Sequence, residues 1–214
     1  MRIVKSPVLP VKAAGGSRLS LVTGDGETLE ARWDGPETPK GAVVFCHPHP
    51  RYGGTMHAPL MNGVSDHLVE RGYAVLRFNF RSAGDSSGHH GGGRDEIADV
   101  DAAFHTAGQR SERVVLAGWS FGGAVALAWQ AAVGSEAAYC GIAPAVTLAP
   151  RSGLAPAQRR IIVGDRDQLV EPESIRSYAR EIGADLVEME GSDHFFYFRH
   201  NQVADLMADW YDRS

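Results

Sequence analysis

A serine flanked by glycines follows an apolar run near the middle of the chain. The run at 114–117 reads Val-Val-Leu-Ala, and Gly118-Trp119-Ser120-Phe121-Gly122 comes directly after it. A segment of helix formers at 124–129 then completes a strand–serine–helix pattern. Glycines two residues before and after the serine let a strand and a helix approach closely around a strained turn. The pattern predicts that Ser120 is a nucleophile; a tight but inert turn is the alternative.

A serine hydroxyl needs a base to take its proton, and the base needs an orienting carboxylate. Asp165 and Asp167 follow the apolar run 161–163, and His194 lies in a glycine-containing loop after the last apolar run. The chain order Ser120, Asp167, His194 is typical of a serine triad with His194 as base and Asp167 as acid. Asp165 is the alternative acid, but its place beside the strand end favours a role in the turn. A histidine that only hydrogen-bonds locally is the alternative for His194.

Attack on a carbonyl also requires donors aimed at the developing oxyanion. The amide of Phe121 follows the nucleophile at a predicted helix start, where the helix dipole favours negative charge. The loop after the apolar run 41–46 reads His47-Pro48-His49-Pro50, and proline has no amide hydrogen. We therefore expect an oxyanion hole formed by the amides of Phe121 and His49.

Histidines in the loops raise the alternative of a metal site. Two groups lie close in sequence: His47, His49 and His57, and the pair His89-His90. Neither has the i, i+4 spacing of a helical metal-binding pair beside a glutamate, and no cysteine pair accompanies them. Gly91-Gly92-Gly93 lacks the lysine and hydroxyl residue of a phosphate loop. We predict no metal and no cofactor.

Four consecutive aromatic residues, Phe195 to Phe198, follow the predicted base. Two interpretations are open. The aromatic side chains line an acyl pocket, or they belong to a helix that packs one face into the core. The sequence does not choose between them, because a predicted terminal helix begins at about Phe198.

Strands and helices alternate along the chain. The predicted strands are 18–23, 28–33, 41–46, 73–80, 114–117, 137–143, 159–163 and 185–189. Helices are predicted after the serine turn and at 58–71, 95–107, 172–182 and 198–210. This order predicts an α/β fold: a mostly parallel sheet with helices on both faces and an antiparallel N-terminal hairpin. Loops at the carboxyl ends of parallel strands converge, so Ser120, Asp167 and His194 are expected in one cleft.

Length and composition are those of a globular enzyme. The 214 residues are 43% hydrophobic and 22% charged, which predicts a single domain over 1–214, with 1–17 as an extended N-terminal arm. The net charge of −5 and the absence of a dense Lys/Arg run disfavour nucleic acid as a partner. No run of about 18 apolar residues is present, so no membrane association is expected.

Compartment is inferred from the chain start and the cysteines. Met1 to Pro7 lacks the long apolar segment of a signal peptide. Cys46 and Cys140 lie in apolar runs, where buried free thiols are expected; a disulfide is the alternative. We expect a cytoplasmic protein.

Taken together, the motifs resemble those of the α/β-hydrolases, in particular small capless bacterial hydrolases. The resemblance runs from about Arg18 to the C-terminus and is carried by the serine pentapeptide and four other segments: 47–54, 78–88, 164–170 and 191–196. It implies the same triad of Ser120, Asp167 and His194. The chain departs from the family at Pro48 and Ser82, where many relatives have glycine. Only about fifteen residues, 144–158, occupy the place of a lid, which predicts an open cleft without activation at lipid interfaces.

We expect a serine hydrolase, foremost a carboxylesterase that cleaves small to medium acyl esters through a Ser120 acyl-enzyme. Its predicted partner is a small-molecule ester. Thioesterase, lactonase and peptidase activities are alternatives, because one triad serves them all. A non-catalytic binding protein of the same fold is the alternative from another class. The physiological substrate and the oligomeric state do not follow from the sequence.

Overall fold

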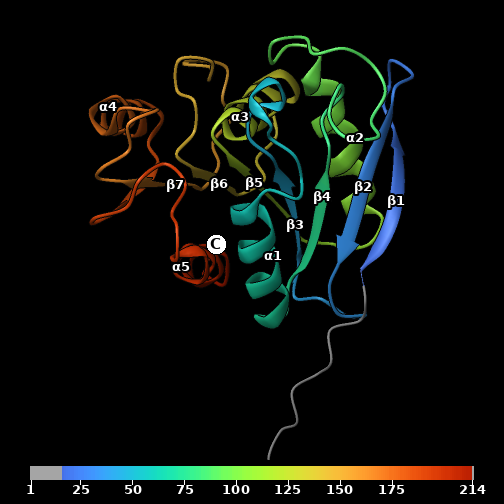
Figure 1. Ribbon diagram of the computed structural model, residues 1–214, viewed down its shortest axis with the longest axis horizontal. Helices are drawn as coiled ribbons and strands as arrows, with labels where there is room; N and C mark the ends of the chain where they lie inside the picture. Colours follow the sequence, from blue (N-terminus) through green and yellow to red (C-terminus); the bar gives the residue numbers. More distant parts are fainter. Residues whose placement is uncertain (1–15, 214) are drawn as a thin grey trace, which may run out of the picture.

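The computed structural model describes residues 16–213 of the chain. Within them, the strands form one eight-stranded sheet in the order β1-β2-β4-β3-β5-β6-β7-β8 (Figure 1). The strands are β1 (Ser17–Val22), β2 (Thr28–Asp34), β3 (Ala42–Cys46), β4 (Ala74–Phe78), β5 (Val114–Trp119), β6 (Tyr139–Ile142), β7 (Arg159–Gly164) and β8 (Asp185–Met189). β2 pairs antiparallel with β1 and with β4, and the pairs from β4 to β8 are parallel. The predicted mostly parallel sheet with an antiparallel N-terminal hairpin is confirmed.

Helices cover both faces of the sheet. They are α1 (Pro59–Glu70), α2 (Glu96–Gly108), α3 (Phe121–Val133), α4 (Pro172–Ile182) and α5 (His200–Tyr211), with a short 3₁₀ helix η1 (Pro50–Tyr52). α1 packs on α5 on one face, and α2 packs on α3 on the other (Figure 1). α4 contacts β7 and β8. None of the helices within residues 16–213 has the length and apolar character needed to cross a bilayer.

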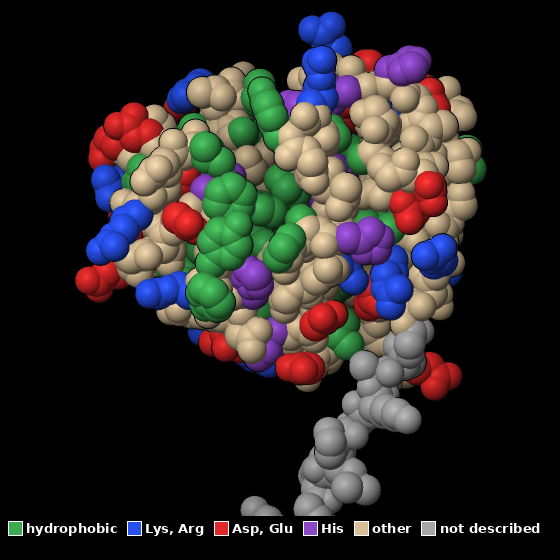
Figure 2. Space-filling view, viewed as in Figure 1, with side chains coloured by type: hydrophobic (Ala, Val, Ile, Leu, Met, Phe, Trp, Pro, Cys, Tyr) green, Lys and Arg blue, Asp and Glu red, His purple; other side chains and the backbone are tan. Residues whose placement is uncertain are grey.

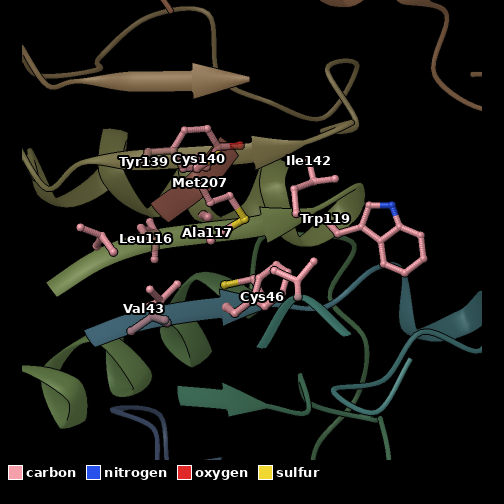
Figure 3. Close-up of a cluster of buried hydrophobic side chains, with 14 of the residues drawn as sticks. Val43, Cys46, Leu116, Ala117, Trp119, Tyr139, Cys140, Ile142 and Met207 are labelled. Carbon is pink, nitrogen blue, oxygen red and sulfur yellow. The ribbon is translucent and has the colours of Figure 1, made fainter. Parts of the chain in front are cut away.

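Every residue of the central strands β3 and β4 is buried, as expected for strands covered on both faces. Figure 3 shows part of the core, with Val43 of β3, Ile142 of β6 and Met207 of α5. Cys46 and Cys140 are both buried free thiols. They lie on β3 and β6 with β5 between them, a separation of about 10 Å at normal strand spacing, which is too long for a disulfide.

Several predicted bounds differ from the structure by one or two residues, and two of these differences have clear local reasons. The last helix begins at His200 rather than Phe198, because Phe198 has a left-handed φ of 63° that a right-handed helix does not accept. β4 begins at Ala74 rather than Tyr73, whose amide instead donates to the Leu68 carbonyl at the end of α1. The predicted arm lies outside the described residues except for Gly16 and Ser17, and Ser17 already belongs to β1.

The loops after β3, β5, β7 and β8 leave one edge of the parallel sheet. The segment between β6 and β7, residues 143–158, contains no helix or strand. Nothing in this segment therefore forms a cap over that edge, and the site described below lies there.

Candidate active site

Ser120 lies at the tip of a sharp turn between β5 and α3. Its backbone has φ 53° and ψ −115°, a conformation that a non-glycine residue adopts only at a cost of about 1–3 kcal/mol. Neighbouring backbone holds it there: the Ser120 amide donates to the Ile142 carbonyl at 2.9 Å, and the Ser120 carbonyl accepts from the Ala145 amide at 2.9 Å. The strained turn directs the hydroxyl into the cleft at the strand ends.

The flanking glycines allow this turn because backbone fills the space of their missing side chains. A Cβ on Gly118 would stand 2.5 Å from the Gly122 carbonyl carbon and from the Gly123 nitrogen. A Cβ on Gly122 would stand 2.4 Å from the carbonyl oxygens of Cys46 and His47 at the end of β3. Any side chain at either position would force β3, β5 and α3 apart.

Asp167 and His194 meet beneath the cleft, from the loops after β7 and β8. His194 Nδ1 lies 2.7 Å from Asp167 Oδ2, and both side chains are buried. The other Asp167 oxygen accepts the amides of Leu169 (2.9 Å) and Val170 (2.8 Å). Because a carboxylate oxygen accepts, Nδ1 of His194 is the donor in this contact, and Nε2 is the ring nitrogen left for the predicted role as base. The indole Nε1 of Trp119 donates to the His194 carbonyl at 3.1 Å and fixes the loop beside the nucleophile.

Asp165 has a different place. Its carboxylate accepts the amide of Gly191 at 2.6 Å, in the loop that carries His194. Asp165 thus joins the two loops, and Asp167 alone of the two acids contacts His194.

Ser120 and His194 line the same cleft. Within residues 16–213 the Ser120 hydroxyl makes no hydrogen bond to His194 or to another residue. Such contacts often tighten only when substrate is bound.

The two expected oxyanion donors, Phe121 and His49, also line this cleft. Neither backbone amide donates a hydrogen bond to any residue in the described part of the chain, so both are available to a ligand. The His49 carbonyl accepts the amides of Tyr52 and Gly54, each at 3.1 Å, and its ring Nδ1 accepts the Arg51 amide at 3.2 Å. These bonds fix the backbone of the loop.

His47 anchors the same loop to the neighbouring strand. The Phe80 amide donates to its Nε2 at 2.9 Å, so Nδ1 carries the proton and donates to the Pro48 carbonyl at 2.6 Å. Complete burial lowers the pKa of His47 from 6.5 to about 4, which keeps the ring neutral. Both ring nitrogens are occupied by this structural role. Within residues 16–213 no group of three or more histidine, cysteine or acidic side chains could hold a metal ion.

The sequence pointed to His90 only as part of a candidate metal-binding pair, whereas the structure places it beside the expected oxyanion donors. Its ring lies 4.7 Å from that of His49 and 5.4 Å from that of Phe121, measured between centroids. Its Nδ1 lies 2.7 Å from Oε1 of the fully buried Glu96. One imidazole therefore contacts the side chains of both expected oxyanion donors, a juxtaposition that no sequence spacing reveals. Burial and the nearby His90 lower the pKa of His49.

The loop after β4 packs behind these residues. Ser82, where the family resemblance predicts glycine, adopts a left-handed φ of 69°. The Arg81 guanidinium pairs with Asp99 at 2.7 Å and with Asp25 at 2.8 Å, which braces the loop against α2 and the hairpin. Burial nevertheless raises the pKa of Asp99 to about 6.

The cleft has a volume of about 820 Å³ and a mostly apolar lining. Its walls come from five segments: the loop after β3, the serine turn, residues 145–148, residues 169–174, and His194 with Phe195 and Tyr197. Several large apolar side chains are exposed at its mouth, namely Tyr52, Leu148, Leu169, Phe195 and Tyr197. Figure 2 shows apolar side chains gathered around a hollow on this face.

A family profile described as serine aminopeptidase, S33, matches residues 37–162. The chain belongs to this family of α/β-hydrolases. Its fold is accordingly the α/β-hydrolase fold, without a cap domain, as the sequence motifs predicted.

Two solved structures and one sequence relative are similar to this chain. An α/β serine hydrolase without lid from Xanthomonas campestris has 29% identity and a TM-score of 0.81, over 97% of both chains. An uncharacterized protein of Rickettsia prowazekii is 27% identical over 198 residues, covering 85% of this chain and 83% of its own. The Pyrococcus furiosus esterase Pf2001 has a TM-score of 0.77 over 92% of this chain and 92% of its own, and at 20% identity it shows the fold alone. The protein is thus similar to lidless serine hydrolases.

Proposed function

We propose that the protein is a carboxylesterase that cleaves small to medium esters through an acyl-enzyme on Ser120. The contact between His194 and Asp167 at 2.7 Å, in a cleft shared with the strained Ser120, carries this proposal. His194 has its Nε2 free to accept the serine proton. The lining of the cleft is mostly apolar, and residues 143–158 form no cap over it. Both features suit an uncharged ester that enters directly from solvent.

The reaction has two halves. Ser120 Oγ attacks the acyl carbon while His194 Nε2 takes its proton, and the carbonyl oxygen becomes an oxyanion held by the amides of Phe121 and His49. When the oxyanion collapses, the ester C–O bond breaks and His194 gives its proton to the leaving alcohol. Water, deprotonated by His194, then attacks the acyl-enzyme, and the carboxylic acid and free Ser120 result.

An active-site label tests the nucleophile directly. Wild-type protein incubated with a fluorophosphonate is expected to gain the mass of one adduct, and Ser120→Ala none, because only an activated serine reacts. An adduct that persists in Ser120→Ala would place the reactive group elsewhere. No adduct on folded wild-type protein would support the alternative of a non-catalytic binding protein.

Turnover of matched substrates tests the bond. Ethyl esters of increasing acyl length are expected to be hydrolysed, and the corresponding N-ethyl amides far more slowly, because an alkoxide leaves more readily than an amine. Faster cleavage of the amides, of thioesters or of lactones would replace the carboxylesterase assignment while keeping the triad.

A further inference from the structure

The aromatic residues that follow His194 are divided between core and cleft. Phe196 is fully buried, whereas Phe195 and Tyr197 line the cleft with 40% and 55% of their surface exposed. The interpretation as a helix that packs into the core is wrong, because the helix begins only at His200 and Phe196 is buried from a loop. Phe195 and Tyr197 line the cleft, as the pocket interpretation expects, but which part of a substrate they meet stays open. Phe198 is wholly exposed and does not line the cleft.

Backbone strain produces this alternation. Phe196 and Phe198 have left-handed φ values of 51° and 63°, which are unusual for aromatic residues. The Asp193 carboxylate accepts the amides of Phe195 and Phe196, each at 3.0 Å, and the Phe196 carbonyl accepts the Arg199 amide at 3.0 Å. The buried Phe196 ring anchors the segment. Strain that the surroundings hold in place beside a catalytic residue points to a functional arrangement.

The rings of Trp119, Phe195 and Tyr197 form one wall, here called the aromatic wall. Phe195 meets Trp119 edge to face at 6.0 Å and 80°, and stacks on Tyr197 at 5.5 Å and 25°. Figure 3 shows Trp119 at the carboxyl end of β5, and Ser120 is the next residue in the chain. The wall thus runs from the reacting centre to the mouth of the cleft, and its outer two rings are left open to solvent although burial would stabilise them.

The position of His194 decides which part of an ester meets the aromatic wall. The Phe195 ring lies 5.7 Å from the His194 ring at 87°. His194 delivers the proton to the leaving oxygen, so the alcohol portion must lie on its side of the serine. The oxyanion amides belong to His49 and Phe121, on the loop after β3 and at the start of α3.

We propose that the aromatic wall is a subsite for an aromatic ring in the alcohol portion of the ester, an inference that rests on the proposed function. Aromatic rings prefer offset-stacked or edge-to-face contact with other rings, an attraction beyond the burial of area that a saturated ring would share. Partly exposed rings on a loop that is held by hydrogen bonds and by the buried Phe196 offer that contact at a reduced ordering cost on binding.

Two esters of one acid test this preference. Benzyl acetate and cyclohexylmethyl acetate have six-membered rings on primary alcohols, and both yield the same acetyl-enzyme, so their kcat/KM values differ only through binding and acylation. The benzyl ester is expected to have the larger kcat/KM by about three- to tenfold, the size of one aromatic pair. Equal values, or preference for the cyclohexyl ester, would overturn the proposal.

A pair of variants assigns the preference to the wall. Tyr197→Leu keeps an apolar side chain at the mouth and removes a ring that contacts neither Ser120 nor His194. It is expected to lower the benzyl preference, the ratio of kcat/KM for benzyl acetate to that for cyclohexylmethyl acetate, at least twofold. Phe198→Leu, one residue further along the same strained loop, is the matched control and should retain the preference. Loss of preference in both variants would indicate general loop disruption and contradict the assignment.

Esters that carry the ring in the acid portion instead of the alcohol portion test which side of the cleft holds the subsite. Methyl phenylacetate and methyl cyclohexylacetate are expected to differ less than the two acetates, because their rings lie on the acyl side. A larger aromatic preference here would move the subsite to the acyl side and contradict the proposal. If neither acetates nor ethyl esters are hydrolysed and no fluorophosphonate adduct forms, the proposed function itself fails, a result distinct from equal turnover of both acetates.

Discussion

The two sides of the cleft are built in different ways. On the side of the predicted nucleophile, Ser120, the loop after β3 and the serine turn fit together through backbone packed on backbone, at Gly118 and Gly122. On the side of the predicted acid and base, carboxylates shape the loops by accepting amide hydrogens: Asp165 from Gly191, and Asp193 from Phe195 and Phe196. A close backbone approach exists there too, between Gly164 and Ser192, but the hydrogen-bonding carboxylates determine the loop shapes.

This difference predicts which substitutions affect stability and which affect the chemistry of the site. Where backbone touches backbone, an added methyl group displaces whole strands, so substitutions act on stability. Where a carboxylate holds a loop, an isosteric amide keeps most of the geometry and removes the charge, so substitutions act on protonation and orientation. Five substitutions, two of them matched controls, test this contrast.

Asp167→Asn is expected to have the largest effect. The amide can still accept from Leu169 and Val170, but it no longer provides the anion that orients His194 and stabilises its protonated form. Turnover should fall by about 10⁴-fold, as in other triads that lose this charge, with the fold intact. Steady-state kinetics on an ester, with circular dichroism and a thermal melt, measure both properties.

Asp165→Asn is the matched control, two residues away on the same loop. Its carbonyl oxygen can still accept the Gly191 amide, so turnover should stay within a few-fold of wild type. A greater loss of turnover in Asp165→Asn than in Asp167→Asn would show that the acid is misassigned.

Gly122→Ala tests the nucleophile side. Its Cβ would stand 2.4 Å from two carbonyl oxygens of the β3 end, and backbone atoms cannot move aside as a flexible side chain does. We expect a loss of about 3 kcal/mol or more in the free energy of unfolding, a decrease in Tm of about 6–12 °C. Urea denaturation and calorimetry measure it.

Gly108→Ala, at the last residue of α2, is the control for the glycine itself. No atom lies within 4 Å of the added Cβ, so the helix propensity of alanine should stabilise the protein or leave it unchanged. If both variants lose stability equally, backbone contact is not what the glycine at 122 provides.

The same contrast explains what the sequence could predict. The serine turn follows from local chemistry, because strand, glycines and helix are consecutive, and its left-handed Ser120 was implied by the flanking glycines. α4 and β8 likewise occur within the predicted bounds, since a proline starts the helix and Gly183 ends it. These features depend on residues that are neighbours in the chain.

Features that form only when distant segments of the chain come together could not be predicted from the sequence. The contact of His90 with His49 and Phe121 joins three loops, and no spacing in the sequence signals it. The strained aromatic loop is another case: Phe198 reads as a helix residue, but Asp193 and the buried Phe196 hold the chain in a left-handed turn that delays the helix to His200.

His47 is an exception on the Ser120 side of the cleft, because there a side chain, and not backbone packing, holds the loop after β3. Its neutral ring accepts the Phe80 amide and donates to the Pro48 carbonyl. Burial lowers its pKa to about 4 in the folded protein, against an ordinary 6.5 in the unfolded chain. Between these values the unfolded chain binds more protons, so the stability that the neutral ring supports is present above pH 6.5 and is lost as the pH falls toward 4. The full loss is about 3 kcal/mol.

His47→Gln isolates this effect, because glutamine offers an acceptor to the Phe80 amide but does not titrate. Urea denaturation at pH 7.5 and pH 4.5 should show wild type losing more stability on acidification than the variant. Asp99, whose pKa is raised to about 6 by burial, acts in the opposite direction over the same range, since its protonation favours the folded state. Its contribution is common to both proteins and cancels in their difference. Parallel pH dependences in the two proteins would mean that the anchor of the oxyanion loop does not depend on the charge of His47.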